Sequence, residues 1–230
     1  VNDPADSTSI SNNYVRSLFE DSHGRFWIGC INALHLYNRS TDNFREIPMY
    51  NERKRIFTHI TSIIESRDGE IWMATSGEGI IRIKDDCSVI RTDNQLSARL
   101  SSLHLSYIYQ DSHGILWIAS ENQGLNMYDP KKDEVKVFNA PSLIGSNQIS
   151  SVCEDADGNL FVGTLANGLY KYKREQHIFE PVPHPGNKAL PVKSLLVDKK
   201  NRLFVGTDGK GMKIYNPEQN RLQDYHITSA

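Results

Sequence analysis

The stretch from Leu105 to Tyr128, LSYIYQDSHGILWIASENQGLNMY, decides the fold of this chain. It reads as an apolar strand, a tight turn, a second apolar strand, a polar loop and a third strand. The same order of residue types occurs five times, at a nearly constant step along the 230 residues. A turn residue returns as Gly24, Gly69, Gly114, Gly158 and Asn201, and an aromatic returns as Trp27, Trp72, Trp117, Phe161 and Phe204. Such a step means that each repeat is one supersecondary unit that packs against its neighbours.

Each repeat supplies four short strands, and no segment shows a sustained helical period. We therefore predict an all-β fold, a β-propeller of four-stranded antiparallel blades. Residues 1–230 form one propeller region, with blades at about 14–49, 60–91, 105–139, 149–182 and 192–227. Polar loops such as Met49 to His59 join the blades. Five whole blades in register indicate a fragment of a larger, seven-bladed propeller, and a self-closed five-bladed ring is the alternative.

Three positions in each repeat are expected to be structural. Gly and Asn adopt positive φ most readily, so we predict a left-handed residue at all five turn positions. The recurring aromatic is expected to pack between blades. The small residue that follows it allows close approach of the neighbouring sheet. The first repeat has Ala33 where the others have a second glycine, and its loop is one residue shorter, so this loop should be shaped differently.

The composition is that of an ordinary soluble globular protein, with 38% hydrophobic and 23% charged residues. A formal net charge of -2 without a basic stripe excludes a nucleic-acid contact by this region. No apolar run approaches the roughly 18 residues of a membrane helix. The first residue is Val1 rather than Met, which indicates a processed product or a cut piece. Three cysteines (Cys30, Cys87 and Cys153) cannot form a complete set of internal disulfides, and Cys30 and Cys153 are expected to pack as small apolar residues.

The motifs that carry catalytic chemistry are missing from the sequence, so we predict no catalytic residue, no metal and no cofactor. Asp155-Ala156-Asp157-Gly158 begins like a calcium loop, but Asn159, Leu160 and Phe161 follow where further ligands are needed. We interpret it as a turn. His23 and His113 hold equivalent turn positions in two repeats and are interpreted as exposed turn residues.

The best copies of the repeat are DSHGRFWIGC, DSHGILWIASENQGLNMY, DADGNLFVGTLANGLYKY and NRLFVGTDGKGMKIY. They resemble the two-component regulator propeller repeat over essentially the whole chain. WD40 and kelch repeats fit poorly, because neither a recurring Trp-Asp or Gly-His pair nor a double glycine is present. The resemblance implies the periplasmic sensor region of a Bacteroides-type hybrid two-component histidine kinase, which is an inner-membrane receptor.

Such a receptor is expected to respond to oligosaccharides and to regulate transcription of polysaccharide-utilisation genes. Its expected partners are the remaining propeller blades, a β-sandwich domain and kinase domains, with a homodimer in the full-length form. The fragment itself would be non-catalytic. A propeller enzyme (a lyase or a glycosidase) and a structural or dimerisation scaffold are the alternatives.

The candidate ligand-binding residues lie in two sets of loops that share one face of a propeller. One set joins the second and third strands of each blade, and the other joins one blade to the next. Polar side chains in both sets suit a neutral sugar, although loop tips are polar in any protein. The candidates are Asn13, Asn32, His59, Glu78, His104, Tyr107, Glu121, Asn122, Gln123, Asn147, Asn167, Asp208 and Lys210.

Overall fold

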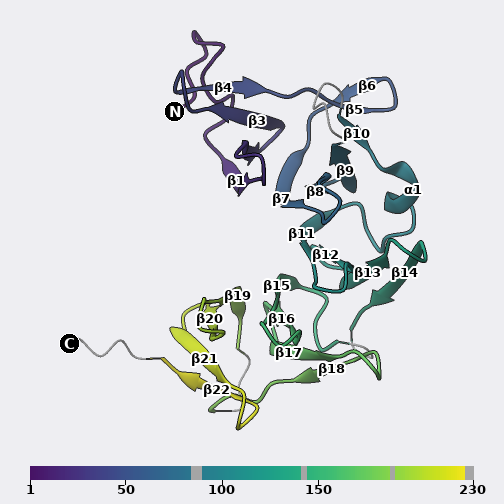
Figure 1. Cartoon of the computed structure of the whole chain (residues 1–230), viewed down its shortest axis with the longest axis vertical. Coiled ribbons are helices and arrows are strands. Elements are labelled where there is room, and N and C mark those ends of the chain that lie inside the picture. Colours follow the sequence, from purple (N-terminus) through teal and green to yellow (C-terminus); the bar gives the residue numbers. More distant parts are fainter. Residues whose placement is uncertain (84–89, 141–143, 187–189, 226–230) are drawn as a thin grey trace, which may run out of the picture. The chain divides into compact units, whose positions relative to one another are not determined.

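The computed structural model describes residues 1–83, 90–140, 144–186 and 190–225 (Figure 1). The fold is an all-β propeller with almost no helix, as the repeats predict. The chain divides into two compact units, Val1–Gln110 and Asp111–Ala230, which are described separately. Cys87 and the predicted end of the last blade at 226–227 lie outside the described residues.

The first unit contains two complete sheets. One sheet has the order β1-β2-β3-β4 and is antiparallel throughout. Its strands are β1 (Val15–Glu20), β2 (Phe26–Cys30), β3 (Ala33–Asn38) and β4 (Asn43–Glu46). The other has the order β6-β5-β10-β9-β8-β7. Its strands are β5 (Met49–Asn51), β6 (Lys54–Ile56), β7 (His59–Glu65), β8 (Ile71–Ser76), β9 (Ile80–Ile83) and β10 (Ile90–Thr92). The helix α1 (Asn94–Ser97) and the strand β11 (Leu105–Gln110) end the unit.

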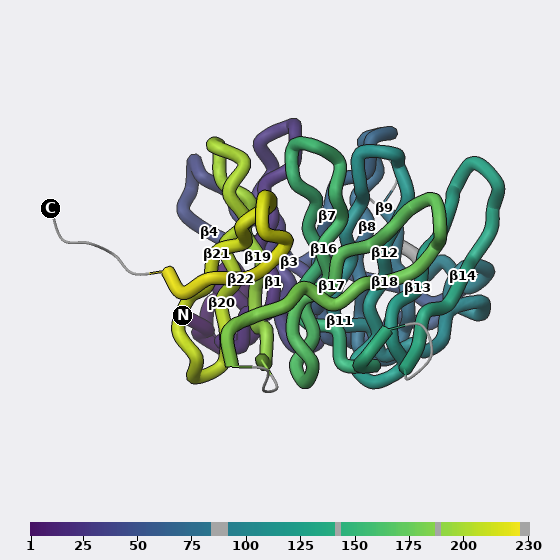
Figure 2. The backbone as a smooth tube through the Cα atoms, turned by 90° about the horizontal axis from the view of Figure 1, so that it is seen from below, coloured from purple at the N-terminus to yellow at the C-terminus, as the bar shows by residue number. Residues whose placement is uncertain are grey.

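The second unit begins with three strands of the third repeat, β12 (Leu116–Ser120), β13 (Leu125–Asp129) and β14 (Glu134–Phe138). The fourth repeat forms the sheet β15 (Ile149–Glu154), β16 (Leu160–Thr164), β17 (Gly168–Lys173) and β18 (Ile178–Pro181). The fifth forms β19 (Val192–Val197), β20 (Leu203–Thr207), β21 (Met212–Asn216) and β22 (Arg221–Asp224). Successive strands of a repeat lie side by side, as β16, β17 and β18 do in Figure 2.

The segment from Met49 to His59 was expected to be a polar loop, and this expectation is wrong. It contains the antiparallel hairpin β5–β6, and β5 pairs in parallel with β10 at the edge of the second sheet. The cause is apolar burial at both ends of the hairpin, because Met49 and Ile56 belong to the same core cluster as Trp27. The charged residues between them only form the exposed hairpin tip, with Glu52 at a φ of 52°.

The structural positions of the repeat have the predicted conformation. The residues Gly24, Gly69, Gly114, Gly158 and Asn201 have φ of 73°, 80°, 83°, 80° and 59°, which confirms the left-handed turn. The first repeat closes its shorter loop with Asn32 at a φ of 66°, between the paired residues Cys30 and Ala33. Its loop therefore differs from the glycine-closed loops of the other repeats, as expected.

The aromatic rings and the small residues form the contacts between neighbouring blades. Four of the five rings are buried, and only Phe204 is half-buried. A Cβ added to Gly29 would lie 2.7 Å from Cβ of Ile60, and one added to Gly163 would lie 2.5 Å from Cγ1 of Val192. These glycines are thus required by the close approach of the next blade, as predicted.

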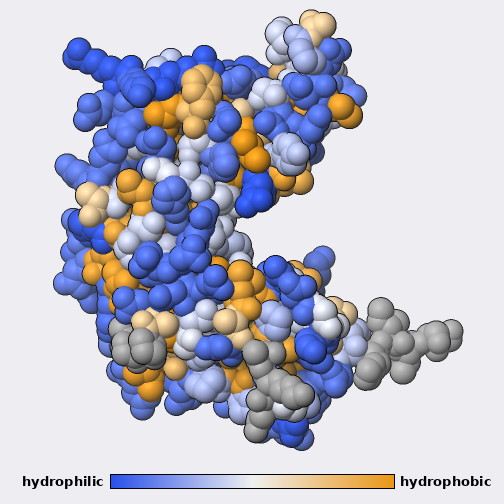
Figure 3. Space-filling view, turned by 180° about the vertical axis from the view of Figure 1, so that it is seen from behind, coloured by the Kyte–Doolittle hydropathy of each residue, from blue (hydrophilic) through white to orange (hydrophobic). Residues whose placement is uncertain are grey.

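Polar residues cover much of the surface, with smaller apolar areas between them (Figure 3). Among the described residues, no helix combines the length and the apolar character that crossing a bilayer requires.

Candidate functional site

Each blade has two chemically different ends. At the end that we call the turn end, the tight turn with the left-handed residue joins the first and second strands. At the opposite end, the loop end, the second strand passes into the third and the chain enters from the preceding repeat. The predicted ligand-binding residues were chosen from the loop end.

In the first unit, the loop end gathers two histidines around one serine. Ser76 ends β8 and pairs with His59 at the start of β7, and it also forms an isolated bridge to His104. The Ser76 hydroxyl lies 3.3 Å from Nδ1 of His104. The Gly77 and Gly79 amides both donate to the Leu103 carbonyl, which fixes the segment before His104 against the loop.

The other candidates of the first unit have different surroundings. The Glu78 carboxylate accepts a hydrogen bond from the Asn51 amide at 2.9 Å. The side-chain oxygen of Asn13 accepts one from the Asn2 backbone amide at 2.7 Å, so it anchors the N-terminal segment. Asn32 closes the short loop of the first repeat, and Tyr107 lies half-buried within β11.

In the second unit, amide side chains connect the loops to the segments between repeats. The Gln148 amide donates to the Asn122 side-chain oxygen at 3.2 Å, and the Asn167 amide donates to the Gly145 carbonyl. The side-chain oxygen of Asn147 accepts the Ala140 backbone amide at 2.6 Å, so Asn147 stabilises its own inter-repeat segment. Tyr170 is buried beside Gly145, and burial raises its pKa, although a hydrogen bond to the Gly145 backbone opposes the rise.

The remaining candidates of the second unit are exposed. Glu121, Asn122 and Gln123 form the tip of the β12–β13 loop. Asp208 forms a surface ion pair with Lys193 at 3.4 Å, and Lys210 is exposed in the same loop as Asp208. The loop ends therefore present mainly amides, hydroxyls and imidazoles, which can donate to and accept from a neutral polyhydroxyl ligand.

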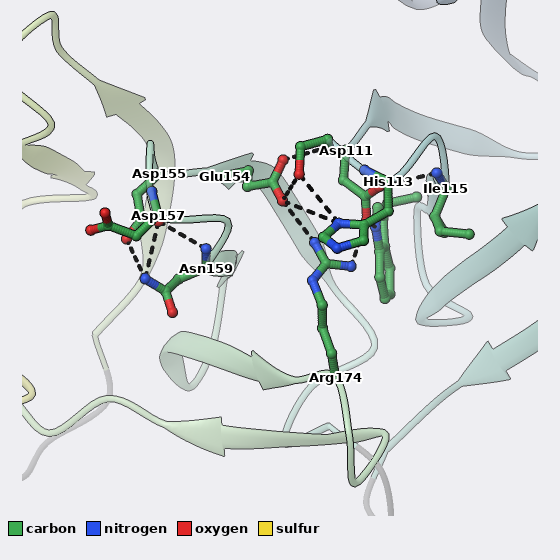
Figure 4. A network of polar contacts seen from close by, with 10 residues as sticks. Asp111, His113, Ile115, Glu154, Asp155, Asp157, Asn159 and Arg174 are labelled. Carbon is green, nitrogen blue, oxygen red and sulfur yellow. Dashed lines mark hydrogen bonds and ion pairs between the residues drawn. The ribbon is translucent and has the colours of Figure 1, made fainter.

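The turn end holds a polar network that sequence reasoning missed (Figure 4). Asp111 is buried, and its Oδ2 accepts from the Trp117 indole N–H at 2.8 Å and from Arg174 at 2.8 Å. Its Oδ1 accepts the backbone amides of His113 and Ile115. Arg174 also donates to Glu154 at 2.8 Å. One signal was available, because an Asp stands six residues before the Trp in the first and third repeats.

The first repeat contains the matching arrangement. The Asp21 carboxylate accepts the Trp27 indole N–H at 2.8 Å and forms a 2.6 Å ion pair with Arg25. Burial opposes ionisation of Asp21, but the hydrogen bonds from Trp27 and Arg25 outweigh it and lower its pKa. The carboxylate is thus a fixed part of the turn.

A second recurring contact links the turn of one blade to the next blade. We call it the turn latch: the last residue of a first strand accepts the backbone N–H of the second turn residue in the preceding repeat. Glu65 accepts from Ser22 at 2.7 Å, Gln110 from Arg67 at 2.8 Å and Glu154 from Ser112 at 2.5 Å. In the fifth repeat Val197 holds this position, and Asn201 accepts from Ala156 instead, at 2.7 Å.

The latch includes a serine, a histidine and an acid, but its geometry is not that of a hydrolase. The Ser112 hydroxyl donates to Glu154 at 2.8 Å and lies 3.2 Å from Nδ1 of His113. A nucleophilic serine would instead be activated by the histidine, and the acid would orient that histidine. The same group recurs as Ser22, His23 and Glu65, which indicates architecture rather than catalysis.

The acidic turn at Asp155 has the hydrogen bonds of a turn. Its Oδ1 accepts the backbone amides of Asp157 at 3.0 Å and Asn159 at 2.8 Å (Figure 4). Asp157 in turn accepts from the Asn201 amide at 3.1 Å. In the described part of the chain, no group of three or more His, Cys, Asp or Glu residues could hold a metal ion.

Two cavities lie away from the predicted residues. One of about 670 Å³ in the first unit lies beside β3 and β4 and is lined by residues that include Tyr37, Phe44 and Arg45. One of about 480 Å³ in the second unit is lined by residues that include Lys171, Lys173 and Arg174. None of the predicted ligand-binding residues lines either cavity.

Comparison with known proteins identifies the repeat. The family model described as two component regulator propeller matches residues 9–32, 55–77, 99–122 and 143–166. "Histidine kinase P4" of Formosa agariphila is 28% identical over 184 residues, which cover 75% of this chain and 13% of that protein. The chain thus spans about an eighth of the curated relative that it matches.

Solved structures share the fold. The extracellular domain of the putative hybrid two component system BT4673 from B. thetaiotaomicron superposes with a TM-score of 0.79 at 21% identity, covering 97% of this chain and 31% of that one. That of BT3049 from the same species gives 0.70 at 19%, covering 97% and 36%. Virginiamycin B lyase from Staphylococcus aureus gives 0.72 at 14%, covering 96% and 73%.

The propeller fold, the recurring turn and aromatic, and the matches in four of the five repeats agree with one another. The chain thus carries four repeats that match the two-component regulator propeller family, at residues 9–32, 55–77, 99–122 and 143–166.

Proposed function

We propose that this chain is a ligand-sensing propeller domain in the extracytoplasmic part of a hybrid two-component sensor. The family of its repeats supports this role, and so do the names of its relatives. The domain is non-catalytic, works in the periplasm as part of an inner-membrane receptor, and adjoins further blades, a β-sandwich and kinase domains. Its signal changes transcription of polysaccharide-utilisation genes.

We infer that the ligand is a neutral oligosaccharide that binds at the loop ends. The carrying observation is the chemistry of these ends, where Ser76 and His104 in one unit and Asn122 and Gln148 in the other provide neutral donors and acceptors. A sugar hydroxyl both donates and accepts, so amides, hydroxyls and imidazoles match it.

The enzyme alternative has one supporting observation, the likeness to virginiamycin B lyase, and at 14% identity this likeness concerns the fold alone. In the described residues, the serine-histidine-acid groups are engaged in the turn latch. A sensor domain therefore accounts for the chain better than a lyase or a glycosidase.

Calorimetric titration of the chain with a panel of neutral plant and host oligosaccharides tests the proposal. We expect heat with at least one neutral glycan, and a loss of about tenfold in affinity, or 1.4 kcal/mol, in His104→Ala or Asn122→Ala. Lys131→Ala, in an exposed turn of the third repeat, is the matched control and should bind normally. Turnover of a glycan would favour the enzyme alternative. The absence of binding heat with every glycan of the panel would favour the scaffold alternative.

A further inference from the structure

The two cavities occupy the same place in two different repeats. In each, the lining includes the left-handed glycine of the first turn, the residue after it, and the hairpin that joins the third and fourth strands. The first-blade cavity also reaches Ser7 and Thr8 of the N-terminal segment. Both cavities lie at the turn end of their blade. Because the backbone around them is alike, their chemistry differs through the side chains that line them.

Strand register places a row of first-blade side chains at this cavity. In the pairing of β3 with β4, Leu36 lies opposite Arg45, and Asn38 lies opposite Asn43. Residues directly opposite one another, and residues two apart along a strand, share one face of an antiparallel sheet. Leu36 also lies opposite Trp27 and packs against the core that this ring shares with the second blade. The row therefore lies on the face that the second blade covers, just beyond the packed core.

The polar groups of this row that are left without a partner are donors. The Asn38 side-chain oxygen accepts the Ser40 backbone amide at 3.0 Å and the Ser40 hydroxyl at 2.7 Å. The Asn43 side-chain oxygen accepts the Thr41 hydroxyl at 2.8 Å. Because both oxygens are used within the hairpin, the two side-chain NH2 groups remain available to donate. The Arg45 side chain forms no hydrogen bond or ion pair with the residues that the structure describes.

The other charged side chains that line this cavity have partners of opposite charge. Arg25 and Arg39 each pair with an acidic residue, and Glu46 pairs with an arginine of β6. Within the described residues, Arg45 is therefore the lining side chain whose charge is uncompensated. A guanidinium beside two NH2 groups favours a ligand with an anionic oxygen, and its planar fork matches a carboxylate through two parallel hydrogen bonds.

The fourth-blade cavity has a different charge arrangement at the same positions. Glu180, on β18, holds there the place of Arg45. It forms an ion pair with Lys173 at 3.2 Å, so the blade itself supplies the acid for this cation. Lys171 lies over two aromatic rings, at 5.6 and 6.0 Å from their centroids. The fourth blade thus provides internally the carboxylate that the first blade lacks.

We propose that the first-blade cavity binds an oligosaccharide that carries a carboxylate, of the uronic acid class. The Arg45 guanidinium pairs with the carboxylate, and Leu36 contacts the apolar face of the sugar ring. The NH2 groups of Asn38 and Asn43 donate to neighbouring oxygens of the sugar. A cavity of about 670 Å³ has the size of a small-molecule site and exceeds what an inorganic anion would fill. The site is separate from the loop ends, so failure of neutral glycans to bind there would not remove it.

Calorimetric titration of the chain with a galacturonic acid trimer tests the proposal, with the neutral galactose trimer of the same linkage as the reference. We expect the acidic trimer to bind at least about tenfold more tightly than the neutral trimer. Its affinity should fall as salt is raised, because salt screens an exposed ion pair. Inorganic sulfate is titrated separately. Equal affinity for the two trimers, or sulfate that binds as tightly as the acidic trimer, would overturn the proposal.

Variants locate the binding of the acidic trimer. Arg45→Ala removes the uncompensated charge and should weaken binding by more than about tenfold. Arg53→Ala, at an exposed arginine of the β5–β6 hairpin, makes the same change of charge outside the cavity and should bind like wild type. Asn43→Asp keeps an acceptor for the Thr41 hydroxyl but replaces the NH2 donor by a negative charge, so it should weaken binding at least as much. Asn216→Asp, in the corresponding hairpin of the fifth repeat, is its matched control.

Amide chemical shifts of the isotope-labelled chain separate this site from the loop ends. The acidic trimer should shift residues 24–25 and 36–46 and leave residues 76–78 and 104 unchanged. Circular dichroism verifies that each variant is folded, and Arg45→Gln replaces Arg45→Ala if the latter is not. No binding of the acidic trimer, shifts confined to the loop ends, or an alanine variant of Arg45 that binds like wild type would each overturn the proposal.

Discussion

The buried carboxylate of Asp111 accepts the indole N–H of Trp117 at 2.8 Å, six residues further along the chain. The bond joins the turn of a blade to the ring that fills the space beside it. Asp21 and Trp27 make the same bond at the same distance. The recurring Asp is thus not only a turn former, because it also satisfies the one polar atom of a buried ring.

Replacing Asp111 should destabilise the second unit strongly. Asp111→Ala leaves the Trp117 indole N–H, one N–H of Arg174 and two backbone amides without their acceptor. Removing one partner of such a buried group costs about 3 kcal/mol. Urea unfolding followed by circular dichroism measures the change. Asp198→Ala is the control at the equivalent turn, where the partner is the exposed Arg202, and we expect a clearly smaller loss there. Equal losses at both positions would show that the bond to the ring contributes nothing.

Replacing glycine by alanine should lower the free energy of unfolding by different amounts at Gly163 and at Gly206, its counterpart in the fifth repeat. Gly163→Ala places a Cβ 2.5 Å from Val192 of the next blade, and overpacking costs about 1–3 kcal/mol. Gly206→Ala meets the Ser194 hydroxyl, which can rotate away, so its cost should stay below about 1 kcal/mol. Thermal unfolding of both variants checks the difference, and a larger loss in Gly206→Ala would contradict the assignment of the blade contact.

The stability of the first unit should fall in mild acid because of His35. This residue is buried on β3, and its Nε2 accepts the backbone N–H of Ser11 at 3.2 Å. Burial lowers its pKa, although the Glu46 carboxylate opposes the shift. Below the ordinary value of about 6.5, the unfolded chain then binds more protons than the folded chain. The free energy of unfolding therefore falls as pH falls from about 6.5 toward the lowered pKa, by at most about 1.4 kcal/mol per pH unit.

Unfolding measured across this pH range in wild type and His35→Asn tests the assignment. The variant should lose the part of the slope that comes from His35. An unchanged slope in His35→Asn would assign the acid sensitivity to other groups.

Two cysteines should resist alkylation in the folded chain. Burial raises the pKa of Cys30 to about 11, and burial with the nearby Asp155 and Glu154 carboxylates raises that of Cys153 to about 12. Because the thiolate is the reactive form, iodoacetamide at neutral pH should label a Cys87→Ser variant slowly. Urea should restore fast labelling. Fast labelling without urea would mean that these strands open readily.

The sequence predicts the propeller well because its signals are periodic. Gly24 and its four counterparts recur at nearly constant spacing, and their conformation follows from residue type alone. The hairpin β5–β6 was missed, since its charged tip resembles a loop while its apolar ends, Met49 and Ile56, pack in a core formed by distant strands.

The turn latch was beyond single-sequence reasoning. Glu65 and Ser22 lie 43 residues apart, and only the packing of one blade on the next brings them together. The sequence can predict which loops lie at the same end of the blades, because the order of the strands in each repeat determines it. Which of them meet depends on side-chain geometry: Ser76 joins His104, while Asn147 is used to hold its own loop.

The most direct test of the central claim, that a neutral oligosaccharide binds at the loop ends, is a titration of the isotope-labelled chain followed by amide chemical shifts. We predict shifts that saturate with the glycan and cluster at residues 76–78, 104, 121–123 and 147–148. Shifts confined to the turn ends, or spectra that no glycan of the panel changes, would contradict it.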